Sequence, residues 1–117
     1  MEKDFIPYQE ALELKQLGFD EECFRFKNNI SNVYEEKGWF NWNQSELFVS
    51  IPLYQQAFRF FREKYSMHGY VEGAYPWFRF YINWDDDTCE GHKESTYEEA
   101  ELACLRKLIE IVKQKQP

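Results

Sequence analysis

The segment from Asp85 to His92 holds the densest group of side chains that could bind a metal ion. Asp85 and Asp87 offer carboxylate oxygens, which Ca²⁺ and Mg²⁺ prefer, and Cys89 with His92 offers the sulfur and nitrogen that bind zinc. The carboxylates lack EF-hand spacing, and one Cys-x-x-His pair is half of a zinc site. We therefore predict an acidic loop without a cofactor. A metal-binding protein or metal-dependent enzyme using Asp85, Asp87 and His92 stays as an alternative.

Nucleophilic catalysis by cysteine requires a histidine near enough to take the thiol proton. The chain has three cysteines and two histidines, so some pair exists from composition alone. Cys104 lies on the apolar stripe of a helix, where a small buried side chain is the simpler interpretation. No nucleophile elbow, phosphate-binding loop or dinucleotide fingerprint is present. We therefore predict a protein that is not an enzyme and has no catalytic residues.

Charge and composition restrict the partners further. The net charge of −7 opposes non-specific binding to DNA or RNA, which depends on Lys and Arg displacing counterions from phosphates. The order helix, hairpin, helix in the second half resembles a double-stranded RNA-binding module, but Glu98, Glu99 and Glu101 stand where that module needs cations. We expect no direct nucleic-acid binding. An acidic inhibitor that mimics nucleic acid is a second alternative.

Aromatic residues are the remaining signal for function. Four Trp, eight Tyr and eleven Phe exceed what one small core normally takes. Trp77, Arg79 and Tyr81 share one face of a predicted strand, and these residue types are enriched at interface hot spots. We therefore expect an interaction with a protein partner or self-association through this face. The competing interpretation is that the first helix of the chain covers it.

The strand that carries these residues is expected between two helices. Phe78, Phe80, Ile82 and Trp84 alternate onto its apolar face. We expect Gly69–Ala74 to pair with it through a turn at Gly73–Pro76, and Asp85–Glu94 to form an acidic return loop. Helices are predicted on either side in the sequence, at Pro52–Tyr65 and Tyr97–Lys113. The second begins with a capping box of Thr96 and Glu99.

The first half is predicted to open with a helix from Pro7 to Leu17. Gly18 provides the positive φ of a helix stop, and Phe19 the accompanying hydrophobic contact. We expect a strand at Cys23–Lys27 and turn chemistry at Asn28–Asn32.

The stretch from Val33 to Ile51 is the least regular part of the sequence. Glu35–Gly38 suggests a hairpin tip and Trp39–Trp42 a returning strand. Leu47, Val49 and Ile51 alternate, as in a strand or a lead into the next helix.

These elements predict an α+β protein: a small antiparallel sheet with about three helices, in the order α-β-β(-β)-α-β-β-α. We expect one domain over residues 1–117. No run of apolar residues is long enough for a signal peptide or membrane span. We therefore expect no membrane partner. Three cysteines at unrelated spacing do not form a disulfide framework, which favours the cytoplasm.

Three blocks of the sequence resemble a known family. They comprise Phe5–Ala11 with Leu14–Asp20, then Pro52–Tyr65, and finally Thr96–Glu101 with Ala103–Val112. In this order they are similar to a family of small uncharacterised proteins encoded by bacteriophages, prophages and bacterial mobile elements. The resemblance covers roughly half of the chain. It implies an accessory factor of a phage or mobile element, and it brings no activity, substrate or site residues.

Overall fold

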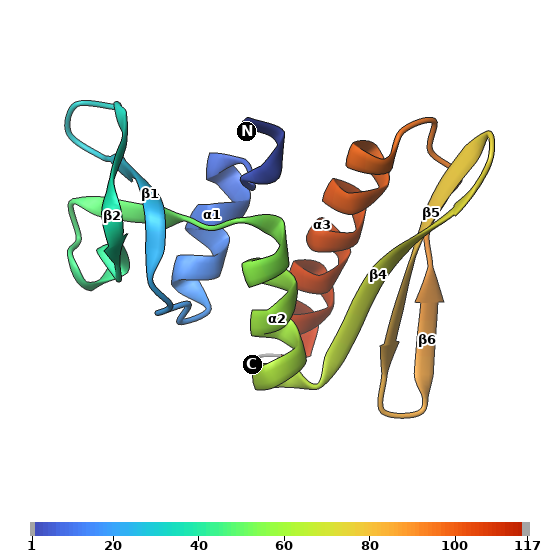
Figure 1. Ribbon diagram of the computed structural model, residues 1–117. Helices are drawn as coiled ribbons and strands as arrows, with labels where there is room; N and C mark the ends of the chain where they lie inside the picture. The colour runs from blue at the N-terminus through green and yellow to red at the C-terminus, as the bar shows by residue number, and fades with distance from the viewer. Residues whose placement is uncertain (1, 116–117) are drawn as a thin grey trace. The chain divides into compact units, whose positions relative to one another are not determined.

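The computed structural model describes residues 2–115 as an α+β chain with two three-stranded antiparallel sheets (Figure 1). The predicted fold class and element order are confirmed: the optional third strand is present in the first half, and β6 is added in the second. The elements are α1 (Tyr8–Gln16), β1 (Cys23–Asn28), β2 (Tyr34–Phe40), β3 (Phe48–Ile51), α2 (Tyr54–Tyr65), β4 (Met67–Ala74), β5 (Trp77–Trp84), β6 (Asp87–Glu90) and α3 (Tyr97–Lys115), with two short 3-10 helices, η1 (Glu2–Asp4) and η2 (Trp42–Gln44).

The chain divides into two compact units, Met1–Ala57 and Phe58–Pro117, each with its own sheet. The sequence predicted one sheet and one domain. Two sheets form because each half supplies three strands that pair only among themselves, in the orders β2-β1-β3 and β4-β5-β6. The single domain stays a prediction.

In the first unit, α1 packs on β3 and ends as predicted. Gly18 has φ 94° and donates its N–H to the carbonyl of Lys15 at 3.1 Å. Phe19 donates to the carbonyl of Leu14 at 2.9 Å. This pair of hydrogen bonds is the Schellman motif, and it satisfies carbonyls that the helix end would leave unpaired. Because Leu14 and Phe19 are also buried, the stop contributes to the core.

The predicted hairpin tip at Glu35–Gly38 is wrong, because these residues lie inside β2. The tip is formed instead by the segment after Asn28. The Asn28 side-chain oxygen accepts the N–H groups of Ile30 and Ser31, and Asn32 adopts a positive φ of 61°. This is asparagine turn chemistry. Gly38 has φ 98° and lies where the pairing of β2 with β1 shifts its register. It therefore marks a β-bulge.

Trp42 is not part of the predicted returning strand, which ends at Phe40. It lies in η2, where its ring stacks on Phe26 with centroids 4.1 Å apart. The Trp42 Nε1–H donates to the carbonyl of Cys23 at 2.8 Å. Phe40 and Phe48 complete the cluster around it. This cluster of four rings therefore accounts for part of the aromatic surplus seen in the sequence.

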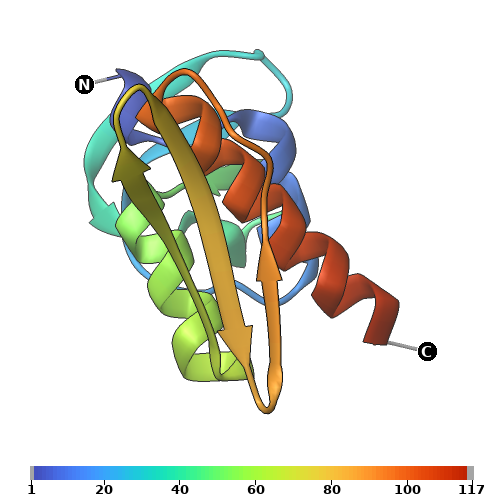
Figure 2. The same ribbon diagram turned by 90° about the vertical axis from the view of Figure 1, so that its right-hand side faces the viewer.

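In the second unit, α3 packs against β4 and β5 and covers one face of the sheet (Figures 1 and 2). The covered side, called the inner face below, carries the apolar residues predicted for β5: Phe78, Phe80, Ile82 and Trp84. Within residues 58–115 the opposite side, called the outer face, carries no helix (Figure 2). The predicted pairing of Gly69–Ala74 with this strand is confirmed, and the turn is limited to Tyr75 and Pro76.

The predicted return loop at Asp85–Glu94 is wrong in its first half. Asp85 and Asp86 form a two-residue turn, with Asp85 at φ 49°, and the chain then enters β6. This strand pairs with β5 from Asp87 opposite Trp84 to Glu90 opposite Tyr81. The sequence did not predict β6, because a short polar edge strand of four residues has almost no periodic signal.

The cap of α3 is confirmed. Glu99 donates its N–H to the Thr96 hydroxyl at 3.1 Å, and the hydroxyls of Ser95 and Thr96 both donate to Glu99 Oε1 at 2.9 Å. These hydrogen bonds lower the pKa of the Glu99 carboxyl.

Candidate surface pocket on the outer face

The register of the second sheet determines which residues share its outer face. Tyr70 pairs with Tyr81 and Glu72 pairs with Arg79 across β4 and β5. Because side chains alternate along a strand, these residues and Trp77 point to the same side. The alternation of Trp77, Arg79 and Tyr81 predicted from sequence is therefore present, on a face that α3 does not cover.

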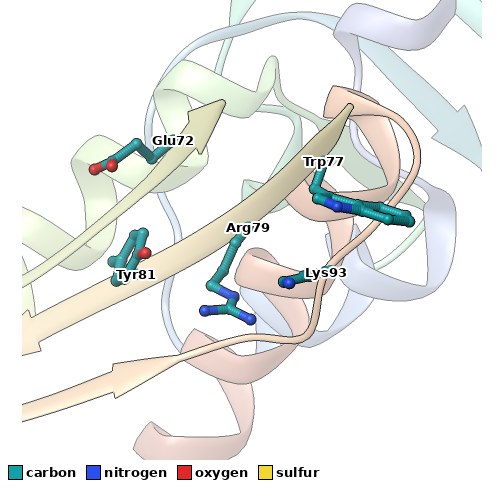
Figure 3. Close-up of a pocket in the computed structure, with 5 residues that line it drawn as sticks. All are labelled: Glu72, Trp77, Arg79, Tyr81 and Lys93. Carbon is teal, nitrogen blue, oxygen red and sulfur yellow. The ribbon is translucent and has the colours of Figure 1, made fainter. Parts of the chain in front are cut away.

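The outer face contains a shallow pocket of about 180 Å³ lined by Glu72, Trp77, Arg79, Tyr81 and Lys93 (Figure 3). Its volume is several times the roughly 30 Å³ that one water occupies in the liquid. It is below the roughly 300–1,000 Å³ of sites that enclose a small molecule or cofactor. The pocket therefore has room for about one side chain.

Aromatic rings form the apolar part of this surface. The rings of Tyr70 and Tyr81 stack with centroids 5.5 Å apart and an interplanar angle of 24°. Trp77 remains 45% exposed and Tyr70 44% exposed. The Lys93 ammonium lies 5.9 Å from the centroid of the Trp77 ring, within cation–π range. The stacked tyrosine rings and the Trp77 ring together form the apolar part of the outer face.

The charged residues of the pocket are incompletely paired. Arg79 Nη1 lies 3.6 Å from Glu90 Oε1, which is longer than a hydrogen bond. Arg79 Nε is buried and has no hydrogen-bond partner among the described residues. Glu72 occupies the position directly paired with Arg79, but its carboxylate points away from the guanidinium in Figure 3. The guanidinium therefore keeps donor capacity that the surrounding side chains do not use.

Lys93 reaches this face through an irregularity in the backbone after β6. Gly91 donates its N–H to the carbonyl of Phe80 at 2.9 Å, which continues the regular register. Glu94 then exchanges both backbone hydrogen bonds with Phe78, at 2.7 and 2.9 Å. The two residues between Gly91 and Glu94 thus face one residue of β5. Two residues opposite one is the arrangement of a β-bulge.

The bulge decides the direction of the Lys93 side chain. In an unbroken register Lys93 would pair with Phe78, whose ring is on the inner face against Tyr97 of α3. The extra residue places Lys93 beside Arg79 instead, and the two side chains lie on the same side of β5 in Figure 3. Bulges commonly redirect a side chain in this way.

The structure brings together all three residues predicted for an interface, Trp77, Arg79 and Tyr81, in this pocket. The sequence reasoning missed Glu72 and Lys93. Glu72 was missed because the predicted turn at Gly73–Pro76 would pair it with Trp77, whereas the shorter turn at Tyr75 and Pro76 pairs it with Arg79. Lys93 was missed because its position depends on the bulge.

The metal candidates are not brought together as a site. Asp85 is in the tight turn, Asp87 begins β6, and His92 follows that strand; all three side chains are exposed. Across residues 2–115, His, Cys, Asp and Glu side chains form no group of three that could hold a metal ion.

The cysteines have distinct surroundings. Burial raises the pKa of the Cys23 thiol to about 12, with Glu21 adding to the shift. Burial likewise raises the pKa of the Cys104 thiol to about 12. Cys89 is partly exposed, and all three are free thiols. Cys104 is thus a core residue, as the apolar stripe predicted.

Exposed apolar side chains are also numerous around β2, in the part of the chain that was hardest to interpret. The largest are Ile30, Val33, Tyr34, Trp39, Phe40 and Leu47. Ile30 is 76% exposed and Trp39 58% exposed. The sequence did not predict this exposure, because the stretch from Val33 to Ile51 lacks a regular pattern.

The chain matches no protein-family model, no curated protein and no solved structure. Among the described residues, no helix is long and apolar enough to cross a membrane.

Proposed function

We propose that this chain is a non-enzymatic protein-binding module and that the outer face of β4, β5 and β6 is its binding surface. The observation that carries the proposal is the uncovered sheet face on which Trp77, Arg79 and Tyr81 converge around one pocket. Trp, Tyr and Arg are the residues that dominate binding energy at protein interfaces. An exposed tryptophan on a rigid sheet loses little conformational entropy when it is buried by a partner.

The dimensions of the pocket favour a protein ligand over a small substrate. A volume of about 180 Å³ accommodates one inserted side chain, as the central pocket of an interface does. The face also carries both signs of charge, with Glu72 and Glu90 near Arg79 and Lys93. It therefore lacks the row of carboxylates that a nucleic-acid mimic would present.

The resemblance to phage and mobile-element proteins supports an accessory role in a bacterial cytoplasm. In such a role the chain would act by binding a host or phage protein.

Affinity capture from a lysate of the encoding host tests the proposed surface. The bait is the whole chain, compared with the double variant Trp77→Ala/Tyr81→Ala. We expect the wild-type chain to retain a protein that the variant loses, because the variant removes the aromatic centre of the face. Circular dichroism and thermal melting establish that both baits are folded.

Trp39→Ala is the matched control, since Trp39 is another exposed tryptophan on a strand. It should leave capture unchanged. Loss of the partner with Trp39→Ala and retention with the double variant would contradict the proposed surface. Sedimentation of the wild-type chain alone establishes whether the partner is a second copy.

A further inference from the structure

We propose that the outer-face pocket recognises an acidic side chain of the partner protein, with its carboxylate between Arg79 and Lys93. This inference rests on the proposed protein-binding function and adds the chemistry of the ligand. It follows from the charge balance of the pocket, from the bulge that brings the second cation, and from the pocket's size.

The two cations of the pocket are only weakly neutralised by carboxylates of the chain. Lys93 has no carboxylate within 4 Å among the described residues, and its ammonium lies over the Trp77 ring, 5.9 Å from the centroid. Arg79 forms one long ion pair, 3.6 Å, with Glu90, whose side chain is largely exposed. In a chain with net charge −7, the pocket thus holds two cations that share a single long ion pair. Their mutual repulsion would be relieved by an anion bound between them.

The geometry of these donors suits a carboxylate. A guanidinium presents several N–H groups in a planar fork that matches the two oxygens of a carboxylate. Arg79 Nε has no internal partner and Nη1 has only the 3.6 Å contact. A rotation of the side chain would therefore cost no short hydrogen bond. Lys93 would add a second charge-assisted hydrogen bond from the opposite side.

The aromatic rings beside Arg79 and Lys93 indicate what the ligand carries next to its carboxylate. Trp77 and the Tyr70–Tyr81 stack flank the cations with exposed apolar surface. An acidic residue adjacent to an aromatic or large aliphatic residue would fill both parts of the site. Glu72 stands at the border of the pocket, and it would disfavour a ligand with several consecutive acidic residues at that end.

Titration of the labelled chain with synthetic peptides tests the inference by amide chemical shifts. The probes are acetyl-Gly-Glu-Phe-Glu-Gly-amide and the same peptide with Gln in place of Glu. We expect the acidic peptide to shift the amides of β5 and of the segment after β6, and to bind at least about fivefold more tightly than the neutral one. Charge-assisted hydrogen bonds are stronger than neutral ones, which gives the expected ratio.

The variants Arg79→Gln and Lys93→Gln should each weaken the acidic peptide about three- to tenfold, with little effect on the neutral peptide. Arg62→Gln is the control, because Arg62 is an exposed arginine on α2 that does not line the pocket. Lys93 is exposed and outside the helices and strands, so its variant stays informative even if Arg79→Gln unfolds.

Three results would overturn the inference: no shift with the acidic peptide at millimolar concentration, equal binding of the neutral peptide, or equal weakening by Arg62→Gln. Tighter binding of inorganic phosphate or of a single-stranded oligonucleotide would also overturn it, since the site would then serve phosphate. Each of these results leaves the capture experiment with Trp77→Ala/Tyr81→Ala intact, so failure of the ligand chemistry is distinct from failure of the binding surface.

Discussion

Gly69 of β4 lies directly against Cys104 of α3. A Cβ added at Gly69 would be 2.8 Å from Cys104 Sγ and 3.1 Å from Leu108 Cδ1. Because glycine has no side chain, α3 approaches β4 more closely here than any other residue would allow. Because Cys104 and Leu108 are fully buried, this contact sets the separation of α3 from the inner face.

Gly69→Ala should destabilise the chain by about 1–3 kcal/mol, because an added methyl overpacks a filled core. Urea unfolding followed by fluorescence measures the change in the free energy of unfolding. Gly73→Ala is the matched control, since its Cβ would meet only the Phe78 ring, at 3.3 Å and beyond. A larger loss at Gly73 than at Gly69 would contradict this packing.

Lys15→Met should cost about 1–3 kcal/mol, because it leaves two carbonyls without their donor. The Lys15 ammonium donates to the carbonyl of Ser45 at 2.8 Å and to that of Phe48 at 2.6 Å. Burial lowers the pKa of Lys15. Thermal and urea unfolding measure the effect. Lys37→Met, which removes an exposed lysine paired with Glu35, should change stability by less than about 0.5 kcal/mol.

Thr96→Ala should lower stability by about 1 kcal/mol, the usual cost of losing an N-cap hydroxyl. The Thr96 hydroxyl accepts the Glu99 N–H at 3.1 Å. Helix content and urea unfolding report the loss. Thr96→Ser keeps the hydroxyl and should restore most of the stability; failure of this rescue would show that the cap is not the cause.

The Glu99 carboxyl should titrate below its ordinary value of 4.5. Hydrogen bonds from Ser95, and then from Thr96, lower the pKa of Glu99. A pKa that is lowered in the folded state adds stability above pH 4.5 and loses it as the pH falls through the folded value. Carbon-13 NMR titration measures this pKa, which should rise in Ser95→Ala. An unchanged value in that variant would contradict the assigned hydrogen bond.

Iodoacetamide should label Cys89 first and leave Cys23 and Cys104 unmodified in the folded chain at pH 8. Burial raises the pKa of both buried thiols to about 12, so little thiolate forms. Their raised pKa values also predict stability that is complete below pH 9 and declines as the pH rises toward 12. Mass spectrometry locates the label, and Cys89→Ser should remove the fast reaction.

Local features of the sequence were sufficient for much of the fold. The stop of α1 at Gly18, the cap of α3 at Thr96 and the alternation of β5 depend on residues within a few positions of one another. Short-range hydrogen bonds and side-chain periodicity produce them, and both can be read along the chain. The three aromatic and basic residues of the candidate site were predicted for the same reason.

The tertiary structure alone decided features that depend on pairing between distant segments. The division of the strands between two sheets, the docking of Trp42 on Phe26 and the close approach of Gly69 to Cys104 have no local signal. Lys93 illustrates the physical reason most clearly. Its sequence neighbours predict a loop, and only the register of the chain after β6 against β5 creates the bulge that turns it toward Arg79.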